Sequence, residues 1–172
     1  MSATTTNDKE LSAAIAKAVA AVEMRVRRHR ARMLVRHPWY GNVGCELDVV
    51  IDPTCDTAWT DGKRMGFNPD FVAKLTGKQL QFVIAHEILH VAMRHPYRRD
   101  NRDPLLWNIA CDYAINLMLV KDGFEAIEGA LMDERFDSMS AERIYSILLA
   151  ERKQQDDDDA QGGAGDEDED DD

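Results

Sequence analysis

The amino-acid sequence predicts an α+β fold that is rich in helices and contains one small, mainly antiparallel sheet. Several long stretches repeat apolar residues at the spacing of a helix. Residues 46–67 instead carry short β-prone runs around Asp61-Gly62, a pair typical of tight hairpin turns. An apolar stretch at 80–93 holds two histidines and a glutamate that a helix would bring together. We expect the sheet to pack on the helix formed by this stretch.

The formal net charge of −11 comes from one end of the chain. Residues 156–172 contain eleven Asp or Glu and no Lys or Arg, so that 21 acids remain elsewhere to balance 21 bases. Such an acidic segment cannot bury apolar surface. The sequence therefore predicts a flexible N-terminus at 1–8, one domain at 9–153 and a disordered acidic tail at 154–172.

The three cysteines are odd in number and have no C-x-x-C spacing, which disfavours a disulfide framework and a cysteine zinc site. A reducing, cytoplasmic setting fits them best. The sequence has no secretory signal and no apolar run of transmembrane length, so we expect no membrane partner.

The first predicted helix starts near a capping-box pattern at Asn7–Glu10 and runs to about Arg36, before His37-Pro38. Its second half is basic, with six arginines between residues 25 and 36. They spread around the helix, and acids elsewhere balance them, which favours a solvated or ion-paired face over nucleic-acid binding. Its apolar face consists of Leu11, Ile15, Ala18, Val22 and Val26.

The next segment, Pro38–Asn42, is predicted as a loop from its composition. Three strands are then expected, at 46–51, 58–60 and 63–67, followed by a short helix over 68–75. The outer strand is a candidate edge to which an extended peptide could pair, and the alternative is a purely structural hairpin.

The stretch LQFVIAHEILHVAM predicts a buried helix over about 77–94 that begins with a capping box. At 3.6 residues per turn, His86 and His90 project from one face, and Glu87 lies about 100° round the helix. This H-E-x-x-H arrangement offers two histidine ligands to a divalent cation and places a carboxylate to act on bound water. The alternative is two core histidines bonded to carbonyl groups, with Glu87 at a solvated edge.

The stretch LLWNIACDYAINLMLV predicts a second buried helix, over 105–120, that is apolar all round. Its polar residues Asn108, Asp112 and Asn116 are four positions apart and form one narrow stripe. A buried carboxylate needs a partner or a metal ion, so Asp112 is the candidate third ligand, oriented by its two asparagines. The alternative is a hydrogen-bonded polar stripe that fixes the packing.

The rival third ligand is His95. It follows His90 by five residues, which places it about 140° from the ligand face if the helix continued. A sharp turn at Pro96 would have to bring it back. The spacing is also one residue short of H-E-x-x-H-x-x-G-x-x-H and lacks its glycine. We therefore favour Asp112.

Beyond the second helix, Gly123 is expected to adopt a left-handed conformation at its end, and Gly129 breaks the segment that follows. A last helix is predicted from Ala141 to about Lys153, capped by Ser140.

Four segments together resemble a family of zincin-like metallopeptidase domains, across about residues 9–150: TDGKRMGFNPDFV, HEILHVAMRH, LWNIACDYAIN and MSAERIYSILL. The resemblance implies a zincin-like fold. It also implies His86, His90 and Asp112 as metal ligands and Glu87 as the catalytic carboxylate.

In that family the domain usually lies N-terminal to a von Willebrand factor A-like domain, and its genes often lie near those of AAA+ ATPases. The resemblance thus implies a partner of either kind and a bacterial cell, or one infected by a bacteriophage. This chain departs from the longer members in its acidic end, which puts the properties of the second domain in doubt.

These observations predict a zinc-dependent metallopeptidase (Zn2+ cofactor) in which Glu87 activates a zinc-bound water to hydrolyse a protein or peptide substrate. Two alternatives stay open. One is a metal-binding adaptor without proteolytic activity, and the other is a nucleic-acid-related module that uses the basic helix or a DNA-mimicking acidic tail. The candidates for stabilising the developing negative charge are Tyr97, Tyr113, His95 and Arg98.

Overall fold

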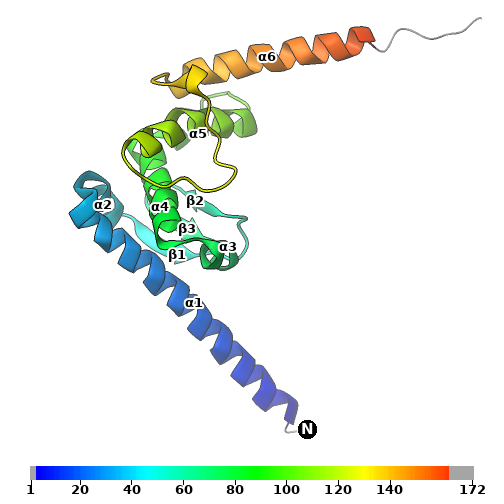
Figure 1. Ribbon diagram of the computed structural model, residues 1–172. Coiled ribbons are helices and arrows are strands. Elements are labelled where there is room, and N and C mark those ends of the chain that lie inside the picture. Colours follow the sequence, from blue (N-terminus) through cyan, green and yellow to red (C-terminus); the bar gives the residue numbers. More distant parts are fainter. Residues whose placement is uncertain (1–2, 163–172) are drawn as a thin grey trace, which may run out of the picture.

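The computed structural model describes residues 3–162 and has the predicted α+β architecture, with helices arranged around a three-stranded sheet (Figure 1). The helices are α1 (Ala3–Arg36), α2 (Pro38–Cys45), α3 (Pro69–Lys74), α4 (Gly77–Ala92), α5 (Pro104–Lys121) and α6 (Ala141–Gly162), with single 3-10 turns η1 (His95–Tyr97) and η2 (Glu134–Phe136). The strands are β1 (Asp48–Ile51), β2 (Ala58–Thr60) and β3 (Arg64–Phe67).

The sheet has the order β1-β3-β2 and is mixed. The predicted hairpin is present: β2 and β3 are antiparallel, and the Asp61 carboxylate accepts hydrogen bonds from the backbone N–H groups of Lys63 and Arg64. However, β1 runs parallel to β3, with Val49 opposite Met65. The prediction of a mainly antiparallel sheet was therefore only half right. The turn residues predict the hairpin of β2 and β3, but they carry no information on the direction in which β1 pairs with β3.

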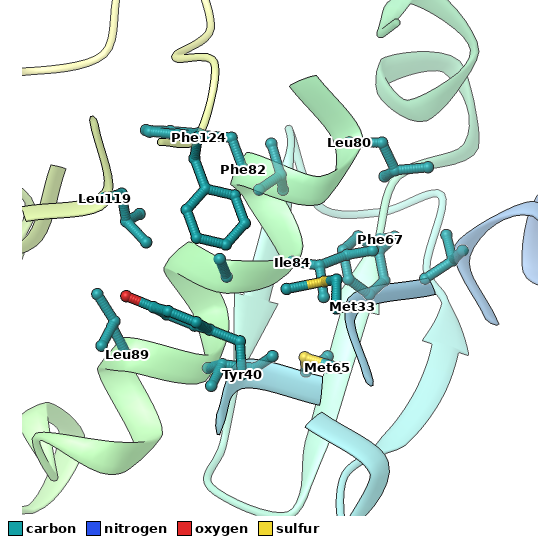
Figure 2. Close-up of a cluster of buried hydrophobic side chains, with 14 of the residues drawn as sticks. Met33, Tyr40, Met65, Phe67, Leu80, Phe82, Ile84, Leu89, Leu119 and Phe124 are labelled. Atoms are coloured by element: carbon teal, nitrogen blue, oxygen red, sulfur yellow. The ribbon is translucent and has the colours of Figure 1, made fainter. Parts of the chain in front are cut away.

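The core lies where α4 meets the sheet and α1. Leu80, Ile84 and Ile88 of α4 are fully buried. Figure 2 shows side chains of α1, β3 and α4 meeting in one cluster, with Leu119 and Phe124 along its edge. Each such apolar side chain stabilises the fold by roughly 1.5–3 kcal/mol relative to its exposed state. The helix that carries the histidine motif is thus anchored in the core along its length.

A second, smaller core joins α5 to α6. Leu106, Trp107 and Ala110 of α5 pack against Ile144 and Tyr145 of α6. Helix α5 contacts α4, α6 and η2, but part of its surface is open, and Leu105 is 71% exposed. The prediction of an α5 buried all round was therefore wrong.

Helix α2 replaces the predicted loop at 38–42. Pro38 stands at the first helical position, where a missing N–H costs nothing. The glycines serve close packing instead of a turn: a Cβ at Gly41 would clash with the backbone of Leu34, and one at Gly44 would lie 2.7 Å from Cδ1 of Ile88.

The helices at the two ends are longer than predicted. Helix α1 already begins at Ala3 and not near Asn7, and residues 1–2 lie outside the described residues. Helix α6 continues to Gly162, so residues 154–162, which we assigned to a disordered tail, are helical. Residues 3–8 and 154–161 contain no Pro or Gly, which lets each helix propagate residue by residue. The acidic residues after Gly162 lie outside the described part.

Both α1 and α6 extend away from the body in different directions (Figure 1). Within residues 3–162, no helix combines the length and the apolar character needed to cross a membrane.

Candidate metal centre

Helix α4 positions the first three candidate residues, and its start agrees with the sequence prediction. The Thr76 hydroxyl accepts from the backbone N–H of Gln79, and the Gln79 side chain accepts from the N–H of Thr76, which forms the capping box. The helix ends at Ala92, and Arg94 adopts a left-handed conformation (φ 56°). This turn leads the chain into η1.

Helix α5 brings Asp112 to the two motif histidines. Asp112 Oδ1 lies 3.2 Å from Nε2 of His90 and 3.5 Å from Nε2 of His86. The two Nε2 atoms are 2.9 Å apart. One ligand atom from each of the three residues lies within 4.8 Å of the others, which is the separation that a shared cation would bridge.

Asn116, one turn after Asp112, holds His86. Its Oδ1 lies 2.8 Å from Nδ1 of His86, and its amide nitrogen donates to the carbonyl of Leu131 at 3.1 Å. Since the amide nitrogen is already engaged, Oδ1 is the acceptor and Nδ1 of His86 must donate. The lone pair of Nε2 is then left facing His90 and Asp112.

His95 lies behind His90, not beside it. Its Nδ1 is 3.2 Å from Nδ1 of His90, the ring nitrogen opposite to the one that faces Asp112. Trp107 donates its indole N–H to the His95 carbonyl at 3.0 Å, which fixes this position. Burial, together with His90 and Arg98, lowers the pKa of His95 to about 3, so the ring is neutral. A neutral His95 can accept a hydrogen bond from the Nδ1–H of His90, which leaves the lone pair of His90 Nε2 free.

The charges of the centre fit a bound cation. Asp112 Oδ1 is buried and makes no hydrogen bond, although both imidazoles approach it. Burial opposes its ionisation, but His86 and His90 outweigh that effect and lower the pKa of Asp112 to about 2. Two imidazole lone pairs and a carboxylate oxygen that converge in a protein interior are costly without a positive partner. The donor set therefore suits a divalent cation.

The pKa of His86 is shifted in the opposite direction to that of His95. Burial alone would lower it, but the neighbouring Asp112 carboxylate and the charge of Glu87 raise the pKa of His86 overall. In the absence of a metal, the centre thus attracts a proton to the place where a cation would bind.

Glu87 lies beside these ligands and is itself 6% exposed. Burial raises the pKa of its carboxyl group, and the charge of Asp112 also raises it. His86 and His90 act in the opposite direction but are outweighed. No hydrogen bond joins its carboxylate to any residue in the described part of the chain. A carboxyl group with a raised pKa can take up a proton and return it near neutral pH.

All of these residues line one cleft of about 610 Å³. Residues 57–60, which include β2, form one wall, and the segment 127–131, which turns at Gly129, contributes to the other. Its floor comes from α4 and α5. The site is therefore open to a ligand larger than an ion.

The structure departs from the sequence interpretation in the supporting residues. We expected both asparagines to orient Asp112, but Asn116 is hydrogen-bonded to His86. Asn108 is exposed in the cleft and forms no hydrogen bond with the Asp112 carboxylate. Arg98 is engaged with Glu142. Of the four candidates for charge stabilisation, His95 alone lines the cleft. The burial of Trp107 against His95 was not anticipated, since nothing in a single apolar helix identifies its neighbour.

Comparison with known proteins points to the same chemistry. A family model described as "Putative metallopeptidase domain" matches residues 21–172. An uncharacterized protein of Thermotoga maritima is 34% identical over 53 residues, which make up 29% of this chain and 13% of that protein. The chain thus matches only a small part of that relative. No solved structure matches the chain.

Proposed function

The chain belongs to the putative metallopeptidase domain family, and from this premise we propose that it is a zinc-dependent peptidase. The observation that carries the proposal is the convergence of three ligand atoms beside a buried glutamate in an open cleft. A structural zinc site would use four protein ligands, whereas three leave a position for a reacting molecule. The chain's fold would then be zincin-like.

The ligands would be Nε2 of His86, Nε2 of His90 and Oδ1 of Asp112. When bound there, the metal ion would polarise the scissile carbonyl and lower the pKa of a water molecule. Asn116 and His95 would keep both imidazoles in the tautomer that exposes Nε2, since each lies at an Nδ1 atom.

Glu87 would be the general base. Its carboxylate would take the proton of the attacking water and then give it to the amine that leaves. Burial favours the protonated form of the carboxyl group, which makes the first transfer, the uptake of the water's proton, easier. The low dielectric around it also strengthens the attraction between developing charges.

Strand β2 would align the substrate. It is an edge of the sheet, because its only strand partner among the described residues is β3, and it forms a wall of the cleft. An extended peptide can add to such an edge through backbone hydrogen bonds. The cleft would then hold the peptide over Glu87 and the ligand triad.

Elemental analysis together with a broad peptide library tests the proposal. The purified protein should hold about one zinc ion per chain and cleave peptides. Glu87→Gln should retain the metal, because Glu87 is not a ligand, and should lose roughly 10²- to 10⁴-fold in turnover. Undiminished cleavage by Glu87→Gln would contradict the role of Glu87. Metal binding without cleavage of any peptide by the wild type would favour an adaptor.

A further inference from the structure

The two ends of the cleft differ in character. Helices α4 and α5 run antiparallel, so each end combines the early part of one helix with the late part of the other. His86 in the middle of α4 meets Asn116 late in α5, whereas His95 after α4 meets Trp107 early in α5. Beyond His86 lies Phe82, and Phe71 and Ile127, which also line the cleft, pack against the core cluster that contains Phe82. At the other end lie Arg99, Trp107 and Asn108.

Strand β2 runs from the apolar end toward the Arg99 end. Ala58 pairs with Phe67, which directly precedes the cap of α3 and hence the segment that carries Phe71. After Thr60 the chain turns at Gly62, where a Cβ would lie 2.8 Å from the hydroxyl of Tyr97. Tyr97 belongs to the same loop as Arg99. The direction of β2 along the cleft is therefore defined by contacts at both of its ends.

Arg99 differs from the two arginines near it. Arg98 makes a bidentate pair with Glu142 at 2.6 and 2.7 Å and donates to the carbonyl of Met93. Arg102 binds backbone carbonyls, and its guanidinium stacks 5.0 Å from the ring of Trp107. Among residues 9–158, none forms a hydrogen bond or ion pair with the Arg99 guanidinium, although Arg99 lines the cleft.

Arg99 is also the single Lys or Arg among the described residues that line the cleft. The apolar end, in contrast, offers no charged group among its lining side chains. A ligand that complements both ends would therefore present a negative group to one and an apolar group to the other.

We propose that the cleft selects extended peptides with an acidic residue on the amino side of the scissile bond and an apolar residue on the carboxyl side. This inference rests on the proposed function. Antiparallel pairing is slightly more stable per residue than parallel pairing, so the peptide runs opposite to β2. Its amino-terminal part then lies near Arg99, and its carboxyl-terminal part lies near Phe71 and Phe82.

The test compares matched peptides that differ only by Glu or Gln on the amino side and by Leu or Ser on the carboxyl side. Because Arg99 is exposed, the wild type should cleave the Glu peptide with a kcat/KM only about two- to fivefold higher, and added salt should reduce the ratio. Arg99→Gln should bring the ratio close to one, and Arg99→Glu should favour a Lys peptide. Arg143→Gln is the control, since Arg143 is exposed and does not line the cleft.

Binding of the same peptides, labelled with a fluorophore, to Glu87→Gln provides a readout without turnover. Preferential binding of the Glu–Leu peptide by Glu87→Gln, with no cleavage by the wild type, would support this inference while refuting the peptidase activity. Cleavage with equal kcat/KM for Glu and Gln peptides, an equal change in Arg143→Gln, or a preference for the reverse order of the two residues would overturn the inference.

Discussion

The protein contains two buried polar regions that differ in almost every respect, although both are built around histidines. One is the centre on α4 and α5, and the other is His29 of α1, whose ring packs against Gly77 at the start of α4. Each contains a buried side-chain atom without a hydrogen-bond partner among the described residues, namely Asp112 Oδ1 and His29 Nδ1.

The charges around the two regions separate them. Burial and then Arg32, Arg25 and Arg28 lower the pKa of His29, so that a cation is excluded there. The pKa of His86 is raised because a carboxylate outweighs its burial. A buried histidine therefore indicates a metal site only where other donors converge on it and where the surrounding charge attracts a cation. The predictions below test that distinction.

Asp112→Ala should have the largest effect. It removes a ligand and the carboxylate that offsets the burial of two imidazoles, so metal affinity should fall by more than the roughly 10- to 100-fold that loss of an outer partner causes. Metal content after dialysis against a chelator measures it. Asn108→Ala is the matched control, because Asn108 lies one turn earlier on α5 and forms no hydrogen bond with His86, His90 or Asp112. Equal metal content in the two variants would refute Asp112 as a ligand.

His95→Leu should have the next largest effect. It removes the ring nitrogen that accepts a hydrogen bond from Nδ1 of His90 and leaves an apolar side chain in its place. Affinity for Zn2+ should therefore fall roughly 10- to 100-fold. His95→Asn, whose side-chain oxygen can take the place of Nδ1, should recover part of the loss.

His29→Leu controls for the loss of a buried histidine elsewhere, and it should bind Zn2+ as the wild type does. Competition with a chromophoric chelator gives these affinities, and the absorption spectrum of bound Co2+ reports the ligand geometry. A His95→Leu variant that lost its metal entirely would instead indicate that His95 is a ligand.

Much of the centre could be predicted from the sequence because it depends on helical periodicity. The spacing of His86 and His90, and that of Asp112 in the next helix, determines which face of each helix carries them. The capping box at Thr76 and the left-handed Gly123 also follow from local patterns, and both are present. These features need no knowledge of what lies across the core.

The features that sequence reasoning missed depend on contacts between distant segments. Gly41 was read as a loop residue, but it is required because α2 packs closely against the backbone of α1. The partner of Asn116 proved to be His86, thirty residues away, where the spacing suggested Asp112. The place of His95 follows from the turn at Arg94 and the indole of Trp107. Periodicity identifies which residues share a face of a helix, but not which segment packs against that face.

The smallest expected effect concerns the pH dependence of stability at His29. Its pKa in the folded protein lies below the ordinary value of 6.5, so the unfolded chain binds a proton more readily. The stability that the neutral ring provides is complete above about pH 6.5 and declines as the pH falls toward the lowered pKa. His29→Gln cannot titrate, and its melting temperature in the metal-free protein should fall less between pH 7 and pH 5 than that of the wild type. The difference should be a few degrees, because a shift of one pKa unit corresponds to about 1.4 kcal/mol. Parallel pH profiles for the two proteins would mean that the three nearby arginines do not disfavour the protonated form of His29. The two histidine regions would then differ only in whether other donors converge on the histidine.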